Sequence, residues 1–246
     1  MGTAPTSELT PLGDYVNGTL VPISGLPHGW EFHSAVALGP AEERTIVREP
    51  VEAVPEAIAK RLGKVRVLAV PYIACTESGD AVARHKPAGE THTAAWVETP
   101  EHINLLLACR ELDAHDTGFE LLASLAELLL PRLTSDERTA YNRLLDEELR
   151  HGARGEIDEE AFAAKKAFLG ASPGQPSASP LEHYRGVSFV STAAEFMHGL
   201  WHDVQVRIGP EHLPVAQLRR RMTLLAELFP LNPGYRLFDE SVEKAQ

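Results

Sequence analysis

The chain of 246 residues contains little cysteine: Cys75 and Cys109 are its only two thiols. Two cysteines do not build a disulfide framework, and they do not supply the several thiolates of a structural zinc site. We therefore expect any metal site to rely on histidine, glutamate and aspartate. Histidine is available, because the chain has 11 of them.

The sequence also lacks a long apolar run. No stretch approaches the roughly 20 residues that a membrane-spanning helix needs. The first 15 residues, MGTAPTSELTPLGDY, lack a basic region followed by an apolar one. The apolar and charged fractions, 43% and 24%, are those of a globular protein. We therefore expect a cytoplasmic location and no membrane partner.

Basic residues are outnumbered, with 23 Lys and Arg against 35 Asp and Glu, which gives a net charge of −12. The acidic excess is concentrated in residues 111–160, where 14 acidic residues face 5 basic ones. A chain with no basic stripe interleaved with aromatic residues is poorly suited to bind a phosphate backbone. We expect no nucleic-acid partner.

Several common loop motifs are absent from the sequence. There is no GxGxxG that opens a helix, no GxxxxGK[ST] and no GxSxG. These absences argue against nucleotide binding by the usual phosphate loops and against the common serine hydrolase fold.

Hydrophobic spacing predicts an α+β protein that is mainly helical. Residues 65–73 alternate as a β-strand does, and 93–97 is the expected partner strand. Over about 103–230 the spacing is helical, so we expect a bundle-like C-terminal half packed with a small N-terminal β region. The predicted helices cover residues 54–62, 103–130, 136–152, 155–169, 192–206 and 214–229.

We expect two parts in the chain, or one integrated domain. Residues 1–100 form an irregular N-terminal segment plus a small α/β region, and residues 101–246 form the helical bundle. The stretch 171–180, ASPGQPSASP, is expected to be a flexible linker within the bundle. Three arginines, Arg219, Arg220 and Arg221, are expected on the polar side of the last helix.

The stretch TAAEFMHGLWHD places Glu195, His198 and His202 at i, i+3 and i+7 of the helix predicted over 192–206. These side chains share one helix face. Two imidazoles one turn apart can hold one cation, and a carboxylate one turn earlier can add a third ligand. The alternative is a solvent-facing polar surface, because Thr192 with Glu195 also fits a capping box.

Two further Glu–His pairs lie on predicted core-facing stripes. Glu111 and His115 fall in the apolar stripe of the helix predicted over 103–130, and Glu148 projects from the apolar side of the next helix with His151 one turn later. A buried carboxylate requires a compensating partner, which a metal, a buried salt bridge or a Glu–His hydrogen bond can provide. At the helix end, His151 also suits the helix dipole without any metal.

Together these sets predict a metal-binding protein whose Glu and His ligands come from several helices. Glu148-x-x-His151 and Glu195-x-x-His198 resemble the ligand pairs of carboxylate-bridged di-iron bundles. We expect a divalent transition metal, iron first and manganese or zinc next, in an oxidoreductase that acts on a small-molecule substrate. The predicted ligands are Glu111, His115, Glu148, His151, Glu195, His198 and His202.

Three alternatives remain open at this point. HGLWH has the spacing of the zinc-peptidase HExxH but places Gly199 at the general-base position, which suggests a degenerate peptidase-like protein. A non-catalytic scaffold or partner-binding protein would use the same Glu–His pairs as hydrogen-bonded polar contacts. In the loop between the two predicted strands, Glu90 and His92 can also be ligands, although we expect solvated loop residues. A homo-oligomer is compatible with the sequence.

Overall fold

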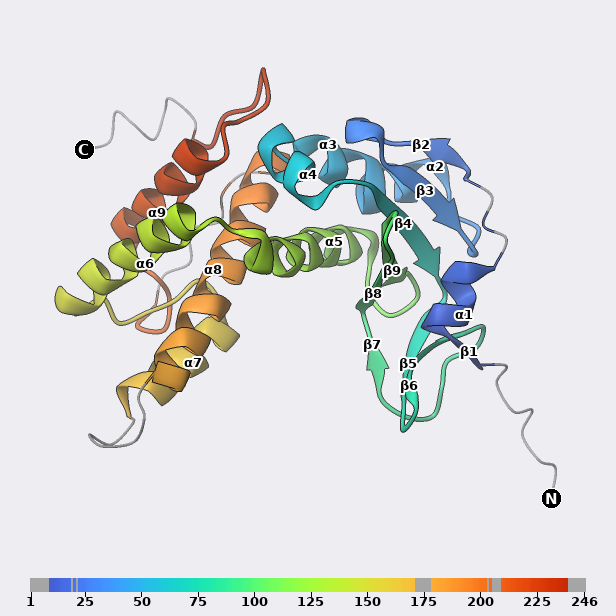
Figure 1. Ribbon diagram of the computed structural model, residues 1–246, viewed down its shortest axis with the longest axis horizontal. Coiled ribbons are helices and arrows are strands. Elements are labelled where there is room, and N and C mark those ends of the chain that lie inside the picture. Colours follow the sequence, from blue (N-terminus) through green and yellow to red (C-terminus); the bar gives the residue numbers. More distant parts are fainter. Residues whose placement is uncertain are drawn as a thin grey trace. The chain divides into compact units, whose positions relative to one another are not determined.

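The computed structural model describes residues 9–18, 20, 22–170, 178–202, 204 and 209–238. The chain forms two compact units, and Figure 1 traces their elements. Unit 1 comprises the residues up to Glu52 together with Leu62–Ser124, and unit 2 comprises Ala53–Arg61 and the residues from Leu125 onward. The predicted α+β class is confirmed: within the described ranges, the strands belong to unit 1 and unit 2 is helical. No helix of the described ranges is long and apolar enough to cross a membrane.

Unit 1 contains a five-stranded mixed sheet in the order β2-β3-β4-β9-β8. Its strands are β2 Ser24–Gly25, β3 Glu31–Ser34, β4 Val65–Val70, β9 Ile103–Ala108 and β8 Ala94–Glu98. The three inner strands, β3, β4 and β9, run parallel, and the two outer strands are antiparallel to their neighbours. The crossover from β3 to β4 carries helical segments, as parallel strands require. These segments are α2 Pro40–Glu43, η2 Arg44–Arg48, α3 Glu49–Ala53 and α4 Glu56–Leu62.

The helix predicted over 103–130 is wrong at its beginning. Residues Ile103–Ala108 form the central strand β9, and helix α5 covers only Ala114–Leu129. All six residues of β9 are buried, so the strand reads as a continuous apolar run without alternation. Such a run cannot be distinguished from a buried helix by periodicity alone. As a consequence, Glu111 lies in the turn before α5 and does not share a helix with His115.

The second sheet of unit 1, here called the hairpin sheet, is antiparallel and has the order β1-β6-β5-β7. Its strands are β1 Leu9–Pro11, β6 Gly79–Ala83, β5 Tyr72–Thr76 and β7 Thr91–His92. The strand predicted over 65–73 is therefore two strands, because Pro71 lacks an N–H donor and separates β4 from β5. The turn between β5 and β6 ends at Gly79, whose φ of 110° strongly favours glycine.

One hydrophobic cluster joins the hairpin sheet, the mixed sheet and helix α1, Leu12–Asn17. Side chains from all three elements are almost completely removed from water, so the two sheets and α1 share a core. Its buried members are Leu12, Val16, Leu68, Val70, Ile73, Val82, Ala95, Leu106 and Ala108. This core anchors one end of β5 and β6, and their other end carries the polar residues described below.

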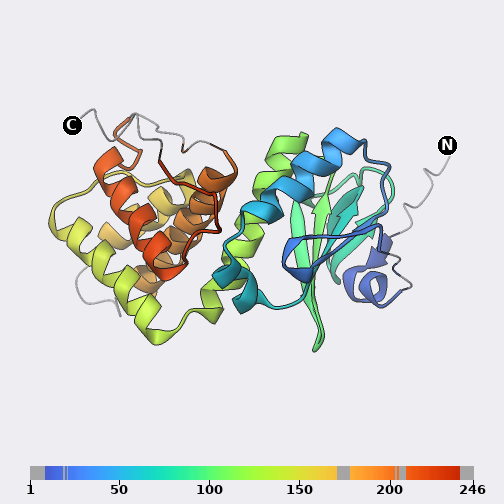
Figure 2. The ribbon, with the colours of Figure 1, turned by 90° about the horizontal axis from the view of Figure 1, so that it is seen from above.

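Unit 2 packs four long helices against one another, as Figure 2 shows. They are α6 Ser135–Arg150, α7 Glu159–Leu169, α8 Ala178–Trp201 and α9 Val215–Leu228. The predicted helices at 136–152 and 214–229 agree with α6 and α9, whereas α7 begins four residues later than the prediction of 155–169. The first residues of the predicted linker, 171–177, lie outside the described residues, whereas 178–180 already belong to α8.

Helix α8 is longer at its N-terminal end than the prediction of 192–206. Thr192 is therefore an interior residue and not a helix cap. Its hydroxyl donates to the Ser188 carbonyl oxygen at 2.7 Å and lies 2.6 Å from the Tyr141 hydroxyl. The capping-box alternative is wrong, because this threonine binds a helix neighbour and a side chain of α6.

Candidate metal site

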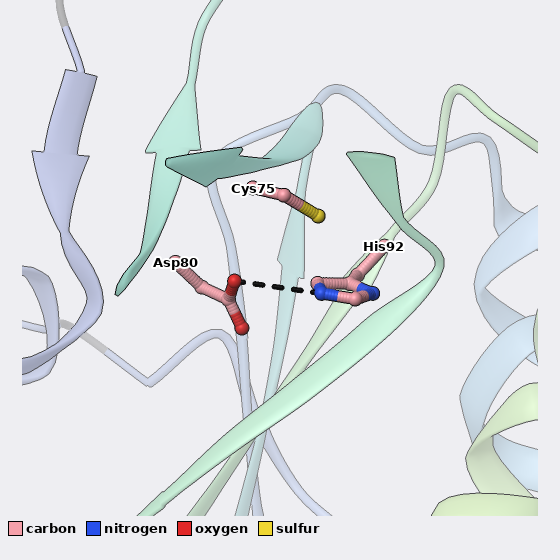
Figure 3. Close-up of side chains that lie close together, drawn as sticks. All are labelled: Cys75, Asp80 and His92. Carbon is pink, nitrogen blue, oxygen red and sulfur yellow. Dashed lines mark ion pairs between the residues drawn. The ribbon is translucent and has the colours of Figure 1, made fainter. Parts of the chain in front are cut away.

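The hairpin sheet brings three ligand-type side chains from three adjacent strands together. Cys75 on β5 pairs directly with Asp80 on β6, and His92 on β7 pairs with Ile73, two residues before Cys75. Side chains directly opposite one another, or two residues apart along a strand, point to the same face. Cys75, Asp80 and His92 therefore point toward one another from one face of this sheet, as Figure 3 shows.

The three polar ends converge to within a few ångströms. The Nε2 atom of His92 lies 3.5 Å from Oδ1 of Asp80. One ligand atom from each of the three residues lies within 4.8 Å of the other two. Ligand atoms of a tetrahedral zinc site are about 3.3–3.7 Å apart, given its usual bond lengths. Small side-chain rotations would bring all three atoms onto one ion.

The local charge favours a cation. Partial burial and then the negative charges of Asp80 and Glu90 raise the pKa of the Cys75 thiol above its ordinary value. The side chains of His92 and Asp80 are 48% and 32% exposed, so an ion can reach them from solvent. A bound cation would reverse the sign of the local potential and stabilise the thiolate.

The same three residue types also occur in nucleophilic triads, but the geometry differs. In a triad, histidine bridges the nucleophile and the carboxylate with opposite ring nitrogens. Here a single nitrogen of His92 lies within 4.8 Å of both the sulfur and a carboxylate oxygen, which lie within 4.8 Å of each other. This convergence on one point fits ion binding and does not fit a proton relay.

Helix α8 places its predicted ligands partly together. Oε2 of Glu195 lies 3.5 Å from Nδ1 of His198, and the ring centroids of His198 and His202 are 5.7 Å apart. His198 is buried, at 5% exposure, and His202 is exposed. The buried Oε1 of Glu195 has no hydrogen-bond partner among the described residues. In the part of the chain that the structure describes, however, only Cys75, Asp80 and His92 bring three ligand atoms within 4.8 Å.

Glu148 of α6 is bound by an arginine of α9. It is 1% exposed, and Arg221 donates to its Oε2 from Nη2 at 2.6 Å and from Nε at 3.0 Å. His151 caps the C-terminal end of α6 on the surface, with Nδ1 2.7 Å from the Glu147 carbonyl oxygen. A buried Glu148 was expected to need a metal, a salt bridge or a Glu–His hydrogen bond, and the structure shows a salt bridge to Arg221.

Arg221 is the centre of a buried ionic network in unit 2. It is 0% exposed, so its expected place on the polar side of the last helix is wrong. Glu156 accepts from Arg221 Nη1 at 2.7 Å, from Lys165 Nζ at 3.1 Å and from the Tyr184 hydroxyl at 2.6 Å. Helical spacing could have indicated this, because Arg221 lies three residues after Leu218 and four before Leu225, both buried.

The remaining predicted pair belongs to unit 1. Glu111 forms an ion pair with Lys86, whose Nζ lies 3.3 Å from Oε2 of Glu111. The other carboxylate oxygen, Oε1, is buried and has no hydrogen-bond partner among the described residues. His115 lies near the beginning of α5 with a side chain that is 44% exposed and 3.5 Å from Asp116. The other five predicted ligands belong to unit 2. A metal shared by the seven residues stays a prediction.

The chain matches no model of a known protein family, no curated protein and no solved structure.

Proposed function

We propose that this protein binds a divalent transition-metal ion, zinc by preference, through Cys75, Asp80 and His92. The observation that carries the proposal is the convergence of one sulfur, one oxygen and one nitrogen atom within 4.8 Å. Imidazole, carboxylate and thiolate are the three ligand types that zinc uses in proteins. Iron was expected from histidine and carboxylate ligands alone, and the added thiolate moves the preference toward zinc.

Binding at this site should be linked to pH. Cys75 must lose its proton to become a ligand, and partial burial together with its acidic neighbours holds the pKa of the free thiol above the ordinary value. Zinc binding therefore releases a proton, and the apparent affinity should rise with pH until the free thiol ionises.

The test is a zinc titration of the purified chain by calorimetry, with metal content measured independently. We expect one zinc ion per chain, and loss of binding in Cys75→Ser and His92→Ala. Cys109→Ser and His85→Ala are matched controls, because Cys109 is buried elsewhere in unit 1 and His85 lies exposed in the loop before β7. A wild-type chain that takes up no zinc, or a Cys75→Ser chain that binds as tightly as wild type, would overturn the proposal.

We propose the Glu195, His198 and His202 set of α8 as a second, separate candidate, supported by the 3.5 Å approach of Glu195 to His198. The predicted iron-dependent oxidoreductase activity would belong to this set, because zinc has no redox chemistry.

The second candidate is tested by melting curves with and without a chelator. Native-state binding stabilises by about 4 kcal/mol at a thousandfold excess over Kd. The chelator should lower the melting temperature of the Cys75→Ser chain, which lacks the first site, and should have little effect after a further His198→Ala or His202→Ala change. Adding His183→Ala or His212→Ala instead should leave the chelator effect intact. An equal shift in all these proteins would refute a site on α8.

A further inference from the structure

The pairing of β5 with β7 places a second acidic residue, Glu90, beside Cys75. The register pairs Ile73 with His92 and Ala74 with Thr91, so the next pair is Cys75 with Glu90. The backbone agrees, because the Cys75 amide donates to the Glu90 carbonyl oxygen at 3.0 Å. Residues directly opposite in an antiparallel pair present their side chains on the same face. Glu90 therefore emerges on the same face as Cys75, on the side away from Asp80.

Cys75 is thus flanked by Asp80 on β6 and by Glu90, which directly precedes β7. Asp80 is its partner on β6, and Glu90 is its partner on the β7 side. Both charges act on the sulfur, since Asp80 and Glu90 each raise the pKa of the Cys75 thiol. Like charges at neighbouring cross-strand positions destabilise a sheet. An ion between them would convert this repulsion into attraction.

We propose that Glu90 supplies the fourth ligand to the ion held by Cys75, Asp80 and His92, which makes the site a closed four-ligand site without a bound water. The inference rests on the proposed metal site. One thiolate, one imidazole and two carboxylates would give the ion four protein ligands, the number that a tetrahedral zinc ion takes, although structural zinc sites usually contain more thiolates. The carboxylate of Glu90 is not among the atoms that already converge, and its side chain is exposed, so the proposal requires this side chain to rotate toward Cys75 when the ion binds.

A closed site has a structural role. Strand β7 consists of only Thr91 and His92, and the loop of residues 84–90 precedes it. With ligands at both Glu90 and His92, the ion fastens the end of this loop to β5 and β6. Metal binding should therefore slow amide hydrogen exchange in residues 84–92 more than in the rest of the hairpin sheet.

The experiment uses the full chain loaded with Co²⁺, whose visible absorption is strong in tetrahedral sites and weak when water raises the coordination number. We expect a strong band in the wild type and, in Glu90→Gln, a band that is shifted in wavelength and weaker, because water then takes the place of the carboxylate. The affinity of the Glu90→Gln chain for Co²⁺ should be at least tenfold lower than that of the wild type. Removing a residue that only hydrogen-bonds a metal ligand already costs about tenfold, and removing a ligand should cost no less. Glu90→His, which restores a ligand, should recover the strong band, and Glu101→Gln, an exposed acidic residue before β9, should change nothing.

Each negative outcome has a distinct meaning. If Glu90→Gln keeps the wild-type affinity and band, the inference is wrong, and the ion is held by three residues with the proposed function intact. If the wild type binds neither Co²⁺ nor Zn²⁺, the proposed function itself fails and the inference fails with it.

Discussion

Replacing Glu148 by glutamine should destabilise the protein strongly. The buried network contains two cations, Arg221 and Lys165, and two carboxylates, Glu148 and Glu156, all at most 1% exposed. Glutamine keeps the shape of the side chain and one acceptor oxygen but removes the charge. Arg221 and Lys165 then share one carboxylate, and one positive charge is left buried without compensation.

Leaving a buried charge unpaired costs about 3–5 kcal/mol. This is a large part of the roughly 5–15 kcal/mol by which a folded protein is stable. At about 2–4 °C per kcal/mol for a chain of this size, the melting temperature should fall by roughly 6–20 °C. The change should appear in thermal melts followed by circular dichroism and as a lower urea midpoint with an unchanged m-value.

The preceding residue provides a matched control. Glu147 pairs with Arg220 at 2.8 Å, but the two side chains are 35% and 50% exposed. Such a surface pair contributes about 0–1 kcal/mol, so Glu147→Gln should have little effect. Glu148→Gln combined with Arg221→Met restores neutrality and should be less destabilised than the sum of the single changes. If Glu148→Gln and Glu147→Gln lower the melting temperature equally, the argument from buried charge is refuted.

Three further predictions follow from buried or crowded positions. Burial opposes ionisation of Glu156, but its buried cation partners outweigh burial and lower its pKa below the ordinary 4.5. The ionised Glu156 should therefore stabilise the fold fully above pH 4.5, and this stabilisation should disappear as the pH falls further. Urea midpoints measured over a series of acidic pH values would show the loss. Gly155→Ala should destabilise by about 1–3 kcal/mol in urea unfolding, since its Cβ would overlap the backbone of His212; an unchanged midpoint would contradict this. A thiol reagent at pH 8 should label Cys75 in the folded protein but Cys109 only after unfolding, because Cys109 is buried and burial raises its pKa to about 12. Added zinc should protect Cys75 from the reagent.

Local sequence patterns were enough to predict the α+β class and most helix positions in unit 2. The helices α6, α7 and α9 were predicted because their apolar residues repeat at helical spacing, and helix formation depends on residues three and four apart. Strand β9 was missed because a fully buried strand has no alternation to reveal it. The length of α8 was missed because its N-terminal residues, ASP, have the composition of a linker.

Which polar groups contact one another became visible only in the folded chain. Glu148 and Arg221 are 73 residues apart, so no local pattern could show that a buried carboxylate would find a guanidinium in place of a metal. Cys75 and Asp80 are placed symmetrically about the turn before Gly79, a signal that was available, but the place of His92 depends on the register of a two-residue strand. Local periodicity determines elements, whereas strand register and helix packing arise from long-range burial. This is why residues expected in a solvated loop now form part of the proposed metal site.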